Sequence, residues 1–223
     1  APYLPVLCDS LEFPAFAIGL SFAPGAMVYM PPIIAGYVGA DHVAALIAAE
    51  IWQTSQTTLF IDIGTNTEVT LSTHDQHFST SCASGPAFEG AHIHDGMRAA
   101  PGAIERVQVI DGQVCIQTIG GQAPVGICGS GILDAVAVML DTGTINPRGK
   151  FEASNSEFVL DGAANVRVTR KDVAEIQLAK SAIRTGIDLL LAQAGISAES
   201  IEQFIIAGAF GTYINVGSAI RIG

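Results

Sequence analysis

The segment Leu59-Phe-Ile-Asp-Ile-Gly-Thr-Asn-Thr-Glu-Val-Thr-Leu71 places a short polar turn between two apolar, strand-like runs. A tight turn of glycine and small hydroxyl residues between two strands forms a nest of backbone N–H groups, which binds phosphate oxygens without a lysine. Asp62, at the end of the first strand, can hold Mg²⁺. The alternative is a plain hairpin turn in which Asp62 and Asn66 bond to their own backbone. The nest predicts Asp62 as the catalytic and metal-binding residue, and it places nucleotide phosphates at Gly64, Thr65, Asn66 and Thr67.

A second strand-to-glycine element lies near the end of the chain. The run Phe204-Ile-Ile-Ala-Gly-Ala-Phe-Gly211 predicts a buried strand that breaks into an open turn. Small residues in such a turn let a flat ring lie against the backbone. The chain contains neither a Walker-type phosphate loop nor Gly-x-Gly-x-x-Gly, so any nucleotide depends on turns of this kind. We therefore predict that adenosine lies against Gly208, Ala209, Phe210 and Gly211.

A third glycine-rich turn, Gly126-Ile-Cys-Gly-Ser-Gly131, opens a predicted helix. Free N–H groups and the helix dipole favour an anion at Gly129 and Ser130. The alternative is that the glycines allow close packing of the helix on a strand. Cys128 is expected to be a buried thiol rather than a reactive one. His92 and His94 have the spacing of a metal pair on a strand, but no further ligand pair supports them, and we expect loop or surface histidines.

Composition argues against several classes of protein. The chain has 223 residues, a net charge of −11 and only 10 Lys and Arg, which is not the footprint of a nucleic-acid-binding protein. Prolines and glycines interrupt the uncharged stretch 13–40, so we expect no membrane span. Ser84 is in Ser-Gly-Pro, not in the nucleophile motif of serine hydrolases. The four cysteines of the chain form no Cys-x-x-Cys motif and therefore encode no zinc or iron–sulfur site. This pattern favours reduced, mostly buried thiols in a cytoplasmic protein.

Hydrophobic periodicity predicts an α/β fold. Residues 1–40 are expected to be irregular, and Asp41 to cap a helix over 42–53. Strands are expected near 58–63, 67–72, 77–82 and 203–207, a hairpin around Asp111-Gly112, and a helix from the 126–132 turn to about 141. Short strands are expected at 157–160 and 166–168. A long helix follows the capping box of Thr169 and Asp172 and ends at Gly195, and Ser197 is expected to cap a short helix.

Four motifs in one order carry a resemblance to a known family: Asp62-Ile-Gly-Thr-Asn-Thr-Glu-Val, Gly85-Pro-Ala-Phe-Glu-Gly-Ala91, Gly126-Ile-Cys-Gly-Ser-Gly131 and Ile205-Ile-Ala-Gly-Ala-Phe-Gly211. Together they resemble the C-terminal ATPase domain of the reductive activators of corrinoid proteins. These belong to the superfamily of actin, sugar kinases and heat-shock chaperones. The resemblance covers the chain from about Pro31 onward. It implies a ribonuclease-H-like, actin-like ATPase lobe with a mixed sheet and flanking helices.

The resemblance also implies a function. Such activators use ATP and Mg²⁺ to drive the reduction of cob(II)alamin to cob(I)alamin in a partner corrinoid protein. The electron comes from an N-terminal [2Fe–2S] domain, whose cysteines this chain does not contain. The partners implied are a nucleotide and a corrinoid protein, with no nucleic acid and no membrane, and a homodimer is left open.

The resemblance places Asp62 in the second of two lobes, because a similar hairpin lies upstream in the family. We therefore expect a fragment, with 1–57 as a connector and the end of the first lobe, and 58–223 as a truncated second lobe. Whether it is an enzyme by itself is left open, and we expect negligible ATPase activity from it alone. Two alternatives are a small-molecule kinase of the same superfamily and a non-catalytic module that docks on a corrinoid protein.

Overall fold

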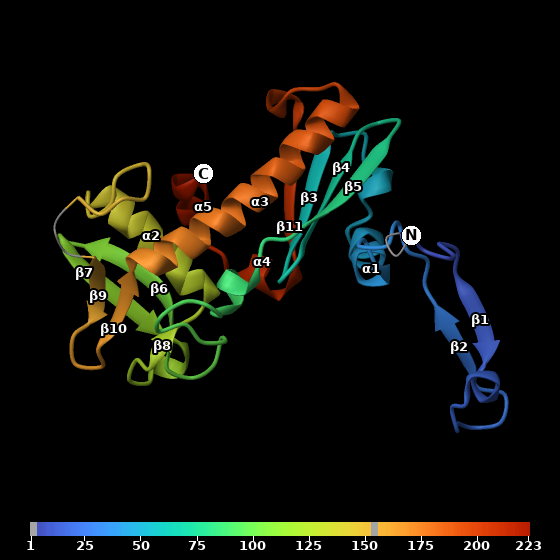
Figure 1. Ribbon diagram of the computed structural model, residues 1–223, viewed down its shortest axis with the longest axis horizontal. Helices are drawn as coiled ribbons and strands as arrows, with labels where there is room; N and C mark the ends of the chain where they lie inside the picture. The colour runs from blue at the N-terminus through green and yellow to red at the C-terminus, as the bar shows by residue number, and fades with distance from the viewer. Residues whose placement is uncertain (1–3, 153–155) are drawn as a thin grey trace. The chain divides into compact units, whose positions relative to one another are not determined.

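The computed structural model describes residues 4–152 and 156–223 and divides into two compact units. Unit 1 comprises Ala1–Asp62, Glu68–Ser81 and Gly186–Ile206, and unit 2 comprises Ile63–Thr67, Cys82–Thr185 and Ala207–Gly223. The chain therefore passes from one unit to the other several times (Figure 1). The boundary predicted between residues 57 and 58, where the second lobe of the ATPase domain is expected to begin, remains a prediction.

A four-stranded sheet organises unit 1, with the strand order β11-β3-β4-β5. Its strands are β3 (Thr58–Ile63), β4 (Thr67–Ser72), β5 (His77–Cys82) and β11 (Gln203–Ala207), with the bounds expected from the sequence. The two central strands, β3 and β4, are largely buried, and their β-branched and aromatic residues favour strand structure. The strand at the edge differs from expectation, because Phe204 of β11 is 54% exposed rather than buried.

One face of β4 and β5 is polar, which the sequence pattern did not suggest. Side-chain hydrogen bonds join Glu68 to Ser81 (3.0 Å), Thr70 to Ser79 (2.7 Å) and Ser72 to His77 (2.9 Å). As the residue number rises along β4, the number of its partner falls along β5, so the three pairs lie directly opposite each other in an antiparallel hairpin.

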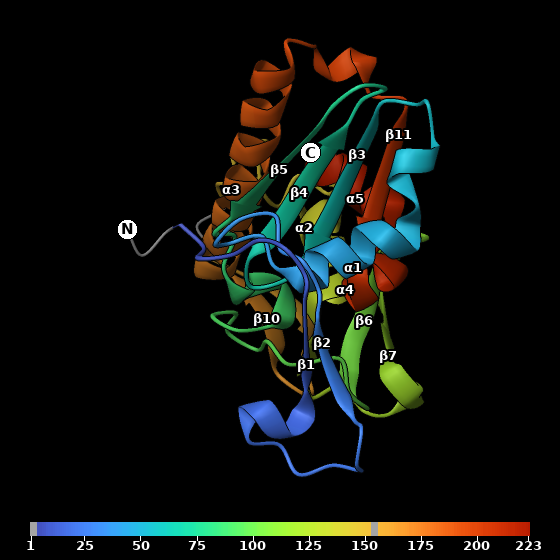
Figure 2. The ribbon, with the colours of Figure 1, turned by 90° about the vertical axis from the view of Figure 1, so that its right-hand side faces the viewer.

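The helix α1 (Ala40–Ala49) lies against a face of this sheet (Figure 2). His42 of α1 is buried, donates or accepts a hydrogen bond with Thr70 Oγ1 at 2.7 Å, and meets the ring of Phe60 edge-on. The expected helix over 42–53 was wrong at both ends. Gly39 is the N-cap, Asp41 lies inside the first turn, and Glu50 ends the helix with φ of 50° before a 3₁₀ turn over Ile51–Gln53.

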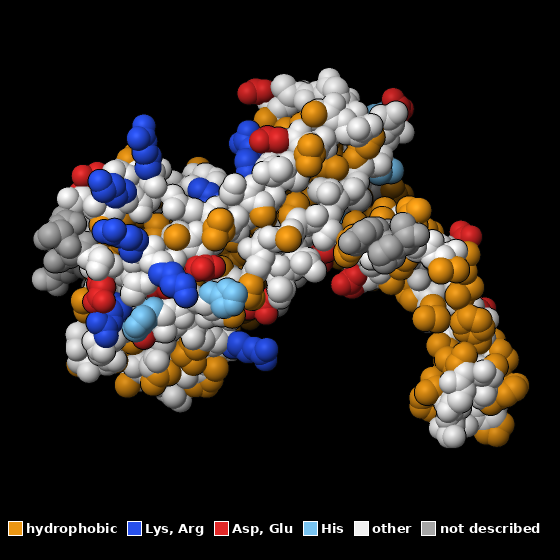
Figure 3. Space-filling model, viewed as in Figure 1, with side chains coloured by type: hydrophobic (Ala, Val, Ile, Leu, Met, Phe, Trp, Pro, Cys, Tyr) orange, Lys and Arg blue, Asp and Glu red, His pale blue; other side chains and the backbone are white. Residues whose placement is uncertain are grey.

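The N-terminal region is also more ordered than expected. Strands β1 (Leu11–Pro14) and β2 (Met27–Met30) form an antiparallel pair, with Leu11 opposite Met30 and a 3₁₀ turn (Ala15–Ile18) after β1. The prediction of irregular structure failed because each strand is only four residues long and the intervening segment is rich in glycine and proline. Figure 3 shows hydrophobic side chains over this hairpin. Phe16, Phe22 and Tyr29 are large hydrophobic residues of this region that are exposed.

Unit 2 is built around α2 (Gly129–Asp141), which packs against β6 and α5. Strand β6 (Ala103–Ile110) is antiparallel to β7 (Gln113–Thr118) and parallel to β8 (Gly126–Ile127). The predicted turn at Asp111 and Gly112 is present, and both residues have positive φ. Every residue of α2 from Gly129 to Met139 is buried, which makes this helix the centre of the core. The unit also contains β9 (Glu157–Asp161), β10 (Val166–Thr169), α4 (Gly208–Tyr213) and α5 (Val216–Ile222).

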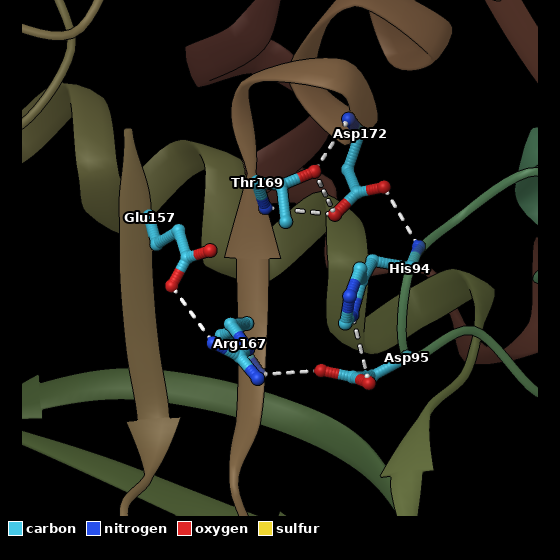
Figure 4. A network of polar contacts seen from close by, with 6 residues as sticks. All are labelled: His94, Asp95, Glu157, Arg167, Thr169 and Asp172. Carbon is cyan, nitrogen blue, oxygen red and sulfur yellow. Dashed lines mark hydrogen bonds and ion pairs between the residues drawn. The ribbon is translucent and has the colours of Figure 1, made fainter. Parts of the chain in front are cut away.

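The start of α3 (Arg170–Ala194) is held by the predicted capping box (Figure 4). Asp172 is fully buried and its Oδ2 accepts from the backbone N–H of Thr169 at 2.7 Å, while Thr169 Oγ1 lies 3.3 Å from the N–H of Asp172. The other carboxylate oxygen of Asp172 accepts from the N–H of His94 at 2.8 Å. Asp95 accepts from the N–H of Arg167 at 2.9 Å, so the loop 90–97 is tied to both β10 and α3.

Two smaller expectations have clear outcomes. Gly195 follows α3 with φ of 68°, as expected for the end of a helix. Ser197 is the N-cap of a 3₁₀ turn (Ala198–Ser200), but its side chain makes no capping hydrogen bond to the backbone. Within the described residues, no helix is both long enough and apolar enough to span a membrane.

Candidate functional site

The phosphate hairpin and the C-terminal glycine element follow neighbouring strands that run in the same direction. Glu202 and Gln203, at the start of β11, donate their N–H groups to the carbonyl of Thr57 at 2.8 and 3.2 Å, just before β3 begins. Since the beginnings of the two strands meet, their carboxyl ends lie at the same edge of the sheet. The turn Gly64–Asn66 and the residue Gly208 therefore emerge side by side. Ligands of open α/β sheets bind outside such carboxyl ends.

A second layer of chain crosses the hairpin and holds it. The N–H of Gly85 donates to Thr65 O at 2.9 Å, and Ser84 Oγ lies 2.7 Å from Thr67 Oγ1 and 3.3 Å from Gly64 O. The hydroxyl of Thr65 donates to the carboxylate of Glu89, at the end of a 3₁₀ turn (Pro86–Glu89). Our sequence reasoning missed Ser84 and Glu89 as site residues, although both lie in or beside the family motif at 85–91. Their role depends on contacts about 20 residues apart in the chain.

A cavity of about 530 Å³ opens in unit 2 beside this layer. It contains three of the predicted site residues, Gly129, Ser130 and Phe210, and it adds Glu89. Thr65 reaches the cavity through Glu89. Six other predicted residues of the described part do not line it: Asp62, Gly64, Asn66, Thr67, Gly208 and Gly211. The remaining lining residues are Phe88, Met97, Arg98, Ala99, Glu105, Ile119, Cys128 and Tyr213.

The glycines at the start of α2 are required by packing. A Cβ on Gly129 would lie 2.8 Å from Phe210 Cε2 and closer still to the carbonyl oxygen of Phe88, and a Cβ on Gly131 would meet the carbonyl of Ile104. This observation supports the close-packing alternative. It is compatible with an anion at the same helix end, because the N–H groups of the first turn have no partner within the helix. Ser130 Oγ donates to Glu105 O at 3.0 Å, so its hydroxyl proton is already in use.

Cys128 caps α2 with extended backbone geometry, and it is buried as expected. Its thiol contacts Ile104 O at 3.4 Å. Cys82 is also buried, but Cys8 and Cys115 are exposed, so the expectation of mostly buried thiols holds for only half of the cysteines.

The segment Gly208–Gly211 is helical and not an open turn. Gly208 has φ of 79° and begins α4, which includes Ala209, Phe210 and Gly211. The ring of Phe210 stacks on that of Phe88 with centroids 5.4 Å apart. The strand therefore leads directly into a helix whose first turn offers N–H groups, and Phe210 contributes an aromatic wall to the cavity.

Asp62 lies half-buried in β3, one residue before the strand ends. Its charge acts on two neighbours. Burial lowers the pKa of His42 despite the opposing effect of Asp62 and Asp41. Burial raises the pKa of Glu68, and the charges of Asp41 and Asp62 add to this effect, although a hydrogen bond from Ser81 opposes it. Among the described residues, no group of three or more His, Cys, Asp or Glu could hold a metal ion. A single carboxylate is nonetheless a normal protein contribution to Mg²⁺ bound with phosphates and water.

The two candidate metal histidines are exposed on the loop that follows the 3₁₀ turn. His94 Nδ1 lies 2.9 Å from Asp95 Oδ1, and His92 Nδ1 lies 3.7 Å from Glu175 Oε2. These contacts fit the prediction of loop or surface histidines.

Positive charge is distributed unevenly. Residues 1–97 contain no Lys or Arg, and all ten basic residues belong to unit 2. On the face drawn in Figure 3, their side chains lie around α2, β9, β10 and α3. The hairpin and the layer that crosses it therefore lack any basic side chain, and the cavity wall contains one, Arg98.

Comparison with known proteins agrees with this architecture. Residues 56–223 match the family model of the C-terminal domain of RACo, the ASKHA domain, and residues 1–54 match that of the RACo middle region. The corrinoid activation enzyme RamQ of Eubacterium limosum is 36% identical over all of this chain and 41% of its own length. A Methanosarcina barkeri reductase of the methylated-amine-specific Co(II) corrinoid protein is 32% identical over 96% of this chain and 43% of its own length.

A solved structure, the reductive activator for a corrinoid, iron–sulfur protein, is 38% identical with a TM-score of 0.85, and the match covers 98% of this chain and 38% of that one. The chain thus spans about two fifths of the length of these relatives. The resemblance and the α/β, actin-like fold class predicted from the sequence are confirmed. The chain belongs to the RACo family, as its middle region followed by its C-terminal ASKHA domain.

Proposed function

We propose that this chain is the nucleotide-binding part of an ATP-dependent reductive activator, which returns a corrinoid protein from the cob(II)alamin to the cob(I)alamin state. Family membership supports the nucleotide and Mg²⁺, and the names of the relatives support the corrinoid partner. The observation that carries the proposal is the arrangement of the hairpin at Gly64 and the first turn of α4, which emerge at the same edge of the sheet.

The residues present suit the phosphates and their metal. Backbone N–H groups of the hairpin and of the α2 and α4 starts are donors for anionic oxygen. Carboxylate and hydroxyl oxygens of Asp62, Thr65 and Glu89 are ligands of the kind that Mg²⁺ prefers, directly or through water. When bound, Mg-ATP supplies the free energy of phosphate transfer to water, and this chain holds and orients the phosphates. The aromatic walls formed by Phe88 and Phe210 suit the apolar part of adenosine.

The electron source is proposed to lie outside this chain. In the described residues, no cluster of Cys, His, Asp or Glu has the makings of an iron–sulfur site. We propose a [2Fe–2S] domain elsewhere in the activator, and a cytoplasmic setting in which the four thiols stay reduced. A homodimer remains a prediction that sedimentation would test.

Nucleotide binding is tested by titrating Mg-ATP into the chain in a calorimeter. Asp62→Asn should weaken binding because the amide keeps the shape and removes the charge that holds the metal. The charge-matched control is Asp111→Asn, in the exposed turn between β6 and β7. Equal affinity of Asp62→Asn and the parent for Mg-ATP would remove Asp62 from the site.

The corrinoid step is tested by mixing the activator, ATP, a reductant and a corrinoid protein, and following the cobalt spectrum. ATP-dependent appearance of the Co(I) spectrum would support the proposal. Phosphorylation of a small hydroxyl compound would favour the kinase alternative. Tight corrinoid-protein binding without any nucleotide binding would favour the docking module.

A further inference from the structure

Glu89 places a carboxylate between the phosphate hairpin and the cavity. Its side chain is exposed, lines the cavity and accepts the hydrogen bond from Thr65. Its backbone position is constrained, because Gly85 bonds to the hairpin at the start of the same 3₁₀ turn and Gly90 closes that turn with φ of 82°. A Cβ on Gly90 would lie 2.6 to 2.8 Å from the backbone of Met97. The carboxylate is therefore presented from a fixed backbone toward Thr65.

Because a carboxylate only accepts hydrogen bonds when ionised, the Thr65 hydroxyl must be the donor in this pair. The two lone pairs of Thr65 Oγ1 are then left for a donor or a cation. A threonine held in this way is a better ligand for a cation, or for a water on a cation, than for a phosphate oxygen, which would need the hydroxyl proton.

The local charge points the same way. Phosphates at the hairpin would meet the carboxylate of Glu89, with no Lys or Arg on the hairpin or on 84–89 to offset it. Arg98 supplies one positive charge on the cavity wall, which also carries Glu105. A bare triphosphate is repelled in such surroundings, and its complex with a divalent cation, which carries two fewer negative charges, is repelled less.

We infer that Glu89 is a positioning residue that makes nucleotide binding depend on a divalent cation. It fixes the Thr65 hydroxyl as a lone-pair donor toward the cation, and its charge disfavours the metal-free nucleotide. This inference rests on the proposed function, since it assumes that phosphates bind at the hairpin.

The test measures ATP affinity by calorimetry, once with Mg²⁺ and once with EDTA, for the parent chain and three variants. Glu89→Gln keeps an acceptor for Thr65 and removes the charge. Thr65→Val keeps the charge and removes the hydroxyl. Glu152→Gln makes the same charge change on an exposed loop residue away from the cavity and serves as the control.

We expect the parent to bind ATP much more tightly with Mg²⁺ than without it. In Glu89→Gln, the ratio of the two affinities should fall about threefold, mainly through tighter binding of metal-free ATP, since solvent screens an exposed charge and limits its effect to a few-fold. Thr65→Val should weaken Mg-ATP binding and leave metal-free binding unchanged. Glu152→Gln should match the parent.

Two results would separate a failure of the role of Glu89 from a failure of the proposed function. If the parent binds Mg-ATP and Glu89→Gln shows the same ratio as the parent, the role of Glu89 is refuted while the proposed function stands. If the parent binds no nucleotide under either condition, the proposed function falls and the role of Glu89 falls with it. Melting curves of Glu89→Gln and the parent should coincide, because the side chain is exposed; a large loss of stability would count against a role confined to the ligand.

Discussion

Replacing Gly129 by alanine should damage both the core of unit 2 and the cavity. The added Cβ would lie 2.8 Å from Phe210 Cε2, 3.0 Å from the carbonyl carbon of Phe88 and closer still to its oxygen. Real Cβ atoms essentially never approach other heavy atoms within 3.0 Å, so the backbone at Phe88 must move. That movement is resisted, because α2 is buried along its length and Phe88 is stacked on Phe210.

The expected cost follows from overpacking. Forcing one methyl group into a well-packed core costs about 1–3 kcal/mol. The upper part of this range applies here, because the nearest atom belongs to backbone and not to the end of a flexible side chain. The gain in helix propensity from Gly to Ala, up to about 1 kcal/mol in a helix interior, is smaller at the first helical position. We expect a net loss of about 2 kcal/mol in the free energy of unfolding.

Urea unfolding followed by circular dichroism measures this loss. Gly162→Ala is the matched control, since a Cβ there meets nothing within 4 Å and the residue has no positive φ. The single tryptophan, Trp52, belongs to unit 1, so its fluorescence reports separately on the unit that does not contain Gly129. A midpoint for Gly129→Ala equal to that of Gly162→Ala would refute the packing argument. Movement of Phe88 should also shift Glu89 and weaken Mg-ATP binding.

Two further predictions concern stability. Asp172→Ala removes the buried carboxylate that accepts from the N–H groups of Thr169 and His94, and it should cost about 2–4 kcal/mol in urea unfolding. Asp172→Asn, which keeps one acceptor oxygen, should cost less, and equal losses would show that hydrogen bonding is not the cause. Burial lowers the pKa of His42 in the folded state, so the unfolded chain binds a proton at a higher pH than the folded chain does. The free energy of unfolding therefore decreases as the pH falls below 6.5, by up to about 1.4 kcal/mol per pH unit. His42→Gln should lack that part of the slope, and an unchanged slope between pH 7.5 and 5.5 would contradict the assignment.

Periodicity and turn chemistry account for what could be predicted of the fold. The strands at 58–63, 67–72, 77–82 and 203–207 were expected with the right bounds. Three of them contain several apolar or β-branched residues, and the mostly polar strand at 77–82 follows turn residues. The short β1–β2 hairpin escaped prediction because four-residue strands leave no measurable alternation. The early end of α1 escaped because Glu50 adopts a positive φ, which its residue type does not suggest.

The candidate site was only partly predictable, for a different reason. Glycine and hydroxyl residues of the hairpin follow a local motif, so Gly64 and Thr65 could be named. The roles of Ser84 and Glu89 arise from hydrogen bonds to a turn about 20 residues earlier, and no local pattern encodes them. The cavity wall brings Phe88 beside Phe210, a pairing that only the folded chain reveals.

The distribution of charge explains why this site depends on geometry. Unit 1 has ten acidic residues and no Lys or Arg, a formal charge of −10, while unit 2 has the other eleven acidic residues and all ten basic ones, a formal charge of −1. The hairpin belongs to unit 2, but neither it nor the crossing residues 84–89 contain Lys or Arg. A phosphate bound there depends on N–H groups and a cation, and not on the lysine of a Walker-type loop. N–H groups act only if the backbone is held in place, and glycines and buried hydroxyls hold it. Small changes such as Gly129→Ala should accordingly weaken nucleotide binding more than the removal of a distant surface charge, because such exposed charges are screened within about 10 Å at moderate salt.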